Sequence, residues 1–179
     1  MGVIQDYDNG VLDRFLVLPT KRTALVIGRL AVTVVTTLIQ AVILVALAIV
    51  AGADFEGGLP GIAILLAAAV LLAIPFAALS NAMAVLVRQE ESVIGAVQFV
   101  QLPLSFLSSV FMATALMPDW MQTVAQYNPV DWAAVAGRAA LEAAPDWSLI
   151  VPRLAWLAIF GLISIALAVR AFRSYQRAI

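Results

Sequence analysis

Four long stretches of the chain are apolar and carry no charged residue near their centres: residues 30–51, 61–87, 92–116 and 150–169. A helix needs about 20 mostly apolar residues to cross about 30 Å of hydrocarbon, because each backbone polar group must be paired inside its own segment. The stretches therefore predict an all-α fold, a polytopic membrane helix bundle with four transmembrane helices. The composition agrees, since 64% of the 179 residues are hydrophobic and only 12% are charged, against about 25% charged in soluble domains.

Charge and residue usage exclude several classes of function. Ten basic residues against eleven acidic ones argue against a nucleic-acid partner, because such proteins usually present a strongly basic face. The chain contains no cysteine and no histidine. It therefore cannot form disulfides, use a thiolate nucleophile, build the usual zinc sites or use histidine in acid/base chemistry.

The basic residues predict the orientation of the bundle, because Lys and Arg near span ends are retained on the cytoplasmic side. With the N-terminus inside, eight lie on the cytoplasmic side: Arg14, Lys21, Arg22, Arg29, Arg88, Arg170, Arg173 and Arg177. Only Arg138 and Arg153 lie outside. We therefore expect a multi-pass protein of the cell membrane with both termini in the cytoplasm, and four tryptophans at the outer interface, where indoles prefer to lie: Trp120, Trp132, Trp147 and Trp156.

Residues 10–19 have the pattern of a short amphipathic helix. Their apolar residues can form one stripe, Asp13 and Arg14 lie off it, and Pro19 would end the helix. The pattern predicts an N-terminal helix on the cytoplasmic membrane surface. Amphipathicity alone favours a helix that only positions the first span over one that receives force from a cytoplasmic partner.

Seven polar side chains interrupt the second and third apolar stretches: Ser80, Asn81, Gln98, Gln101, Ser105, Ser108 and Ser109. The five from Gln98 onward recur mainly at spacings of three or four, which places them largely on one face of a helix. Polar groups inside a bilayer are expected to face other helices or a water-filled path. Helix-to-helix hydrogen bonding is at least as good an interpretation as the lining of a transport path.

The segment 117–149 carries the signals of short helices before the last span. Asn128 followed by Pro129 predicts a turn, and Asp131 falls in the first turn of a helix that ends before Pro145. Short helices with Trp and Met at the outer interface would cover the bundle. They would act as membrane anchors or as a gate over an exit path.

Two missing features limit the chemistry further. The sequence has no G-x-x-x-x-G-K-[ST] phosphate loop, so the chain cannot use ATP by that route. No charged residue lies near the centre of a span, as ion-coupled carriers usually require. Transport would need an external energy source, and the spans hold no acid/base pair for an intramembrane enzyme.

Several stretches together resemble the permease subunits of ABC type-2 exporters, most closely the daunorubicin-resistance branch. They are GVLDRFLVLP at 10–19, Gly28-Arg29, Gln89-Glu90 before a span, LPLSFLSSVF at 102–111, MPDWMQ at 117–122, and Tyr127-Asn128-Pro129 followed by Arg138. The match follows the family's order along almost the whole chain. It is therefore more specific than any single motif.

The resemblance implies a membrane subunit that forms homodimers or heterodimers, pairs with two copies of a separate ATP-binding subunit and exports a hydrophobic drug or lipid-like molecule. It implies no cofactor in this chain, because ATP is bound by the partner. In the family a coupling helix before the third span contacts the ATPase, and this role carries over to Gly10, Leu12, Asp13, Arg14, Leu16 and Pro19. The docking interpretation of residues 10–19 is then favoured. The family's short re-entrant helices correspond to residues 117–144.

The chain departs from the family in the number of spans. Family permeases usually have six, and the four expected here begin where the third would begin, so residues 1–179 represent one partial permease domain without the first two spans. The preferred hypothesis is an ATP-driven exporter permease. The alternative from another class is a non-transporting membrane scaffold or orphan half-permease. A secondary carrier ranks third, because it would need polar or ionic ligands near the midplane.

Overall fold

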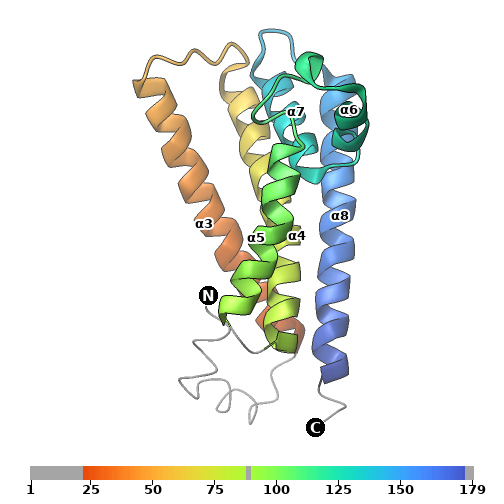
Figure 1. Ribbon diagram of the computed structural model, residues 1–179. Helices are drawn as coiled ribbons and strands as arrows, with labels where there is room; N and C mark the ends of the chain where they lie inside the picture. The colour runs from red at the N-terminus through yellow and green to blue at the C-terminus, as the bar shows by residue number, and fades with distance from the viewer. Residues whose placement is uncertain (1–21, 88–89, 176–179) are drawn as a thin grey trace.

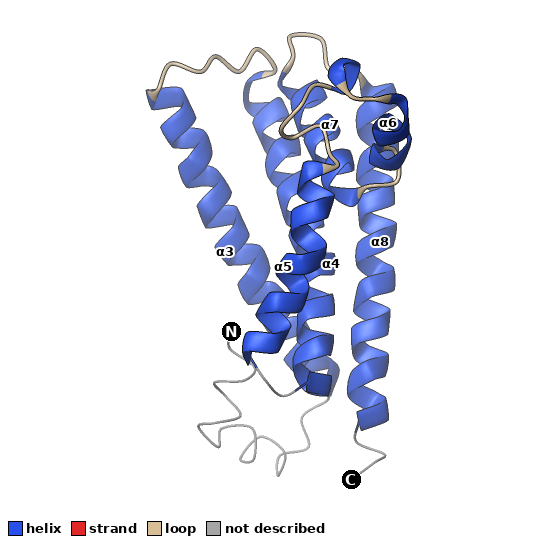
Figure 2. Cartoon of the chain, in the orientation of Figure 1, coloured by secondary structure: helices blue, strands red, loops and turns tan. Residues whose placement is uncertain are grey.

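The computed structural model describes residues 22–87 and 90–175, and every regular element in that part of the chain is helical (Figures 1 and 2). The elements are α3 (Arg22–Val50), α4 (Gly58–Val87), α5 (Glu90–Phe106), the 3₁₀ helix η1 (Thr114–Leu116), α6 (Asp119–Ala125), α7 (Pro129–Leu141) and α8 (Trp147–Tyr175). The predicted all-α bundle is confirmed. The predicted amphipathic helix at 10–19 lies outside the described residues.

α4 is the central helix of the bundle and packs against α3, α5, α7 and α8. α3 begins, and α8 ends, at one end of the molecule, which we call the base end (Figure 1). α6, α7 and the loop between α3 and α4 lie at the opposite end, the cap end (Figure 1). The start of α3 and the end of α8 thus lie at the same end of the molecule.

Three helices are long and apolar enough to cross a membrane: Gly28–Val50 in α3, Gly58–Ala84 in α4 and Trp147–Arg170 in α8. They correspond to the first, second and fourth predicted spans. α3 leans away from the other helices toward the cap end (Figure 1). Leu30 of α3 is buried, but most of the large apolar side chains that follow it in α3 are exposed.

The third predicted span, residues 92–116, is wrong in its extent. α5 ends at Phe106 after 17 residues, which at 1.5 Å per residue gives about 25 Å of helix. The Ser108 hydroxyl donates to the Ser105 carbonyl at 2.6 Å, a local bond that competes with continued helix. Carbonyls of the last turn are also bound by a side chain from the start of α7. Hydropathy indicates where the chain avoids water, and it does not indicate where an apolar helix stops.

α7 lies so close to the start of α4 that only glycine fits at Gly57 and Gly61. A Cβ at Gly57 or Gly61 would overlap the carbonyl of Ala140, and one at Gly137 would lie 2.7 Å from Leu65 Cδ1. The Gly57 N–H donates to the Leu141 carbonyl at 2.9 Å. Small residues allow such close backbone approach, which favours helix association where lipid replaces water. α7 is therefore firmly seated on α4 at the cap end.

Small side chains also dominate the rest of the core. One cluster of buried residues joins α3, α4 and α8 toward the base end and consists of Leu30, Ala78, Ala82 and Ala168. Two others join α4, α7 and α8 toward the cap end and include Ala68, Ala133, Leu157 and Ile150. α4, α7 and α8 together form the rigid part of the bundle.

Candidate functional site

The start of α7 is fixed by Asn128, which is 2% exposed. Its backbone is extended, and its side-chain oxygen accepts a hydrogen bond from the Val130 N–H at 2.9 Å. Pro129 follows in the first helical position, where its missing N–H costs nothing. Asp131 lies in the first turn, where a negative charge interacts favourably with the helix dipole. The predicted turn and helix are confirmed.

The side-chain nitrogen of Asn128 stabilises the end of α5. Its Nδ2 donates to the Leu104 carbonyl at 2.6 Å and to the Leu107 carbonyl at 3.1 Å. The last carbonyls of a helix have no partner inside the helix, so an external donor stabilises them. One side chain therefore starts α7 with its oxygen and ends α5 with its nitrogen.

Asp131 joins the segment after α5 to α7 and α8. Its Oδ1 accepts the Ser109 N–H at 2.8 Å, and its Oδ2 lies 4.0 Å from Nη1 of Arg153 on α8. The side chains of Asp131 and Arg153 are 7% and 23% exposed. A buried carboxylate is tolerated when it is paired and hydrogen-bonded. We call Ser108, Ser109, Asn128, Asp131 and Arg153 the cap-end cluster.

Side chains also hold the non-helical chain around this cluster. Arg138 Nη2 donates to the Val110 carbonyl at 3.2 Å, and Gln122 Nε2 donates to the Met117 carbonyl at 2.9 Å. Non-helical backbone is tolerated at membrane depth where protein covers it. In the segment that replaces the last part of the predicted third span, residues 108 and 109 are thus buried, whereas residues 110–116 are exposed and Arg138 of α7 binds one of their carbonyls.

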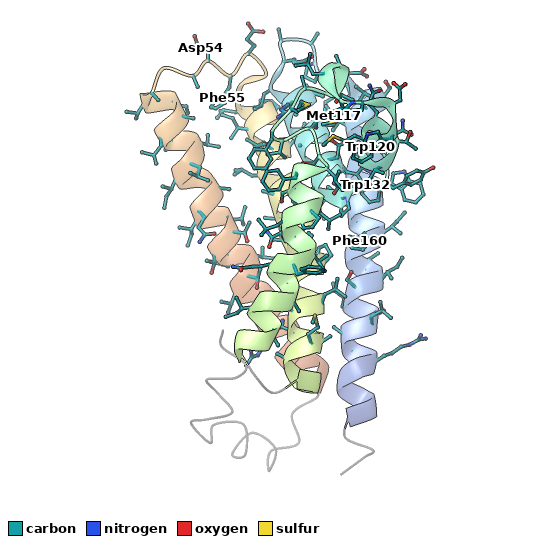
Figure 3. All side chains as sticks on the ribbon, viewed as in Figure 1. Asp54, Phe55, Met117, Trp120, Trp132 and Phe160 are labelled. Carbon is teal, nitrogen blue, oxygen red and sulfur yellow. The ribbon has the colours of Figure 1, made fainter. Side chains whose placement is uncertain are left out.

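Aromatic residues gather at the cap end, where Figure 3 shows Trp120 on α6 and Trp132 on α7 close to Met117. The rings of Trp132 and Trp156 lie 6.2 Å apart at a tilt of 37°. Trp147 is the first residue of α8. The pKa of the preceding Asp146 is lowered, mainly by a hydrogen bond from the Ser148 hydroxyl and also by hydrogen bonds from backbone N–H groups. These tryptophans thus lie toward the cap end, and their position at the outer membrane interface stays a prediction.

Comparison with known proteins identifies the family. The model of the ABC-2 family transporter protein matches residues 1–170. The chain belongs to the ABC-2 transporter family. The resemblance drawn from the sequence motifs is confirmed.

Two curated relatives of the chain are drug-resistance permeases. It is 30% identical over 133 residues to the daunorubicin resistance ABC transporter permease protein DrrB1 of Streptomyces coeruleorubidus, covering 74% of this chain and 47% of the relative. It is 29% identical over 158 residues to the probable doxorubicin resistance ABC transporter permease protein DrrC of Mycobacterium tuberculosis, covering 88% of this chain and 57% of the relative. The chain thus spans about half the length of these relatives. No solved structure matches it.

Within this ABC-2 permease chain, the predicted polar residues divide into two groups. Ser105 lies in the last turn of α5, and Ser108 follows the helix and belongs to the cap-end cluster. Gln98 and Gln101 are exposed on α5, and in the described part of the chain no other group hydrogen-bonds with their amides. The structure therefore separates the glutamines from the two serines in environment, although all four were placed on one helix.

Ser80 and Asn81 lie on α4 and are half-buried. They stand between Ala78 and Ala82, which are buried in the cluster that joins α3, α4 and α8. The predicted coupling residues Gly10, Leu12, Asp13, Arg14, Leu16 and Pro19 lie outside the described residues. The coupling role therefore stays a prediction.

The sequence reasoning did not foresee the cap-end cluster as a unit. Asn128 and Asp131 were interpreted as signals for a turn and a helix start, Asn128 also as part of a family motif, and Arg153 as a basic residue on the outer side. A usable signal was present, because Asp131 and Arg153 are opposite charges flanking apolar helices in a chain with few charges. Such residues in a membrane domain usually pair with each other.

Proposed function

We propose that this chain is the membrane-spanning subunit of an ATP-driven exporter, which moves a hydrophobic drug or lipid-like molecule out of the cell. The single observation that carries the proposal is the family match over residues 1–170, with relatives named as drug-resistance permeases. The energy comes from a separate ATP-binding subunit. The chain's own spans hold no charged group at their centres that could couple an ion gradient to transport.

The cap end faces outward in this proposal. Arg29 and Arg170 lie toward the base end, and Arg138 and Arg153 lie at the cap end, where each contacts an acceptor. Basic residues on the cytoplasmic side are the usual pattern. The exposed Trp120 and Trp147 then lie at the outer interface of the cell membrane.

Gln98 and Gln101 mark the side of α5 that faces either the substrate path or a second permease subunit. They are three residues apart, so they share a helix face, and both are exposed in this chain. Amides in contact with lipid tails are unfavourable, and amides that meet another helix or a polar path are stabilised. This supports a homodimer or heterodimer of permease subunits in which α5 lies next to the path.

The coupling to the ATP-binding subunit is assigned to residues 10–19. The segment combines an apolar stripe with Asp13 and Arg14, so it can lie on the membrane surface and present both charges to a cytoplasmic partner. Gly10, Leu12, Leu16 and Pro19 would shape and end this helix. Movement of the partner during ATP hydrolysis would reach α3 through it.

The first experiment is affinity purification of the tagged chain from membranes that contain its native partners, scored for a co-purifying ATP-binding subunit. Inverted vesicles from the same cells are then assayed for ATP-dependent uptake of a fluorescent anthracycline. We expect both the partner and the uptake. Correct insertion without the partner would contradict the proposal, and partner recovery without uptake of an anthracycline or a fluorescent lipid would favour a non-transporting scaffold.

A further inference from the structure

α5 is attached to the rest of the chain at its two ends and is largely uncovered between them. Near the base end Val93 is buried against Ala84 of α4. From residue 98 to residue 103 every side chain is exposed. At the cap end the helix meets the cap-end cluster. The position of its outer half therefore depends on that cluster.

The attachment at the cap end consists mainly of hydrogen bonds to backbone groups. Asn128 binds the carbonyls of Leu104 and Leu107, and Asp131 binds the N–H of Ser109. The apolar neighbour Phe106 contributes little cover, since it is 61% exposed and stacks on Phe111 of the same segment. Hydrogen bonds to backbone can be exchanged for water or for other donors with a small net change in free energy. Such an attachment can be released without disrupting an apolar core.

The two sides of this attachment differ in rigidity. α7 is held against α4 by backbone contacts at Gly57 and Gly61, and the Gly137 contact adds to them. The only glycine of α5, Gly95, lies nearer its base end, and a Cβ there would meet nothing within 4 Å, so no close glycine contact of this kind holds the cap end of α5. α7 is thus a fixed support, and α5 with residues 107–109 is the element that can move.

Ser109 is a second indication that the attachment between α5 and the cap-end cluster can be released. Its side chain is 2% exposed, and its hydroxyl has no hydrogen-bonding partner within the described part of the chain. A buried hydroxyl without a partner destabilises the arrangement that buries it. This group would gain partners if residues 107–109 became accessible to water.

We propose that the cap-end cluster is a releasable tie, in which Asn128 is the positioning residue for the outer half of α5. The inference rests on the proposed function: the tie is closed at rest and opens during ATP-driven transport, which exposes Ser109 and frees the end of α5. Asn128 and Asp131 act through α5 and need not touch the substrate.

The test uses the accessibility of residue 109. The chain contains no cysteine, so Ser109→Cys introduces a single thiol and leaves the backbone N–H that binds Asp131. The complex with the ATP-binding subunit is placed in lipid nanodiscs, and the rate of labelling by a membrane-impermeant maleimide is measured without nucleotide. Asn128→Asp keeps the oxygen that caps α7 and removes the amide that binds α5. We expect it to raise the labelling rate about tenfold or more, because both hydrogen bonds from the Asn128 amide, to the carbonyls of Leu104 and Leu107, are lost.

Two control variants separate a specific release from general loosening. Gln122→Glu makes the same amide-to-carboxylate change at the cap end, where Gln122 binds the Met117 carbonyl and not α5, and it should leave labelling of residue 109 slow. Phe111→Cys, at a position 68% exposed, should be labelled quickly in every condition. The proposed tie would be refuted if residue 109 were labelled at the same rate with and without the Asn128→Asp substitution. It would also be refuted if Gln122→Glu raised that rate as much as Asn128→Asp does.

The second arm adds ATP to the complex that carries only Ser109→Cys. Labelling should become faster while ATP is hydrolysed and return to the resting rate with ADP. Protection that persists during hydrolysis and substrate uptake would overturn the regulated opening and leave the proposed function standing. A preparation that never contains the ATP-binding subunit would overturn the proposed function, and the regulated opening with it.

Discussion

The close contact between α4 and α7 predicts that replacing glycine by alanine changes the free energy of unfolding in opposite directions at two sites. Gly61 lies in α4, and a Cβ there would overlap the backbone carbonyl of Ala140. Gly95 lies in α5, and a Cβ there would meet no atom within 4 Å. Both residues are helical, so replacing either by alanine should gain about 0.5–1 kcal/mol of helix propensity. Only Gly61→Ala also forces two backbones apart.

The cost at Gly61 follows from what the new methyl group meets. Overpacking in a well-packed core costs about 1–3 kcal/mol, and a backbone carbonyl cannot rotate away as a flexible side chain can. Taking the upper part of that range and subtracting the gain in propensity leaves a net loss of about 2 kcal/mol. Gly95→Ala should be neutral or stabilising by up to about 1 kcal/mol. The two variants should therefore differ by about 3 kcal/mol, more than a hundredfold in the folding equilibrium.

The free energy of unfolding can be measured by titrating the purified chain from mild detergent into SDS and following tryptophan fluorescence. Trp132 on α7 contacts Trp156 on α8, so the signal reports on the packing of these helices. Gly28→Ala, in α3, has nothing within 4 Å of its Cβ and serves as a second control. Equal stability of the Gly61→Ala and Gly95→Ala variants would refute the argument that glycine is required by the α4–α7 contact.

Three further predictions follow from the charged and polar residues. Reversing both charges at Asp13 and Arg14 should abolish ATP-dependent uptake and leave membrane insertion intact, measured in inverted vesicles; unchanged uptake would remove these residues from the coupling path. Replacing Gln98 and Gln101 together by leucine should weaken uptake or subunit assembly, measured by transport and by co-purification of differently tagged permeases, and normal values of both would exclude them from path and interface. Asp131→Asn keeps an oxygen acceptor and should lower the free energy of unfolding by about 1 kcal/mol, whereas Asp131→Leu leaves a buried N–H unpaired and should lower it by about 2–3 kcal/mol; equal losses in SDS titrations would contradict that role.

The sequence was sufficient for those features that depend on local pattern. Hydropathy and length predicted α3, α4 and α8 as spans, because a run of about 20 apolar residues has few alternatives to a membrane helix. Asn128 and Pro129 predicted the start of α7, because the capping side chain and the fixed proline φ angle act within a few residues.

Other features depend on residues that are distant in the sequence and could not be predicted in this way. α5 ends at Phe106 because the Asn128 amide binds carbonyls at positions 104 and 107, more than twenty residues earlier. The special role of Gly61 depends on Ala140, which lies on another helix. Neither contact leaves a periodic signal in the apolar stretches that contain it.

The distribution of buried polar side chains connects the fold with the proposed movement. Among the described residues, the buried polar or charged side chains are Ser108, Ser109, Asn128, Asp131 and Ser164, and all but Ser164 belong to the cap-end cluster. A helix satisfies its own backbone, so the spanning helices have little need of buried polar groups. Residues 107–113 are not helical at the end of an apolar stretch, and side chains pair part of their backbone, at Leu107, Ser109 and Val110. Helical backbone bonds are lost only when the helix unfolds, whereas side-chain bonds can be lost one at a time. The place where side chains replace the helix is therefore the place where this bundle can open at the smallest cost in free energy.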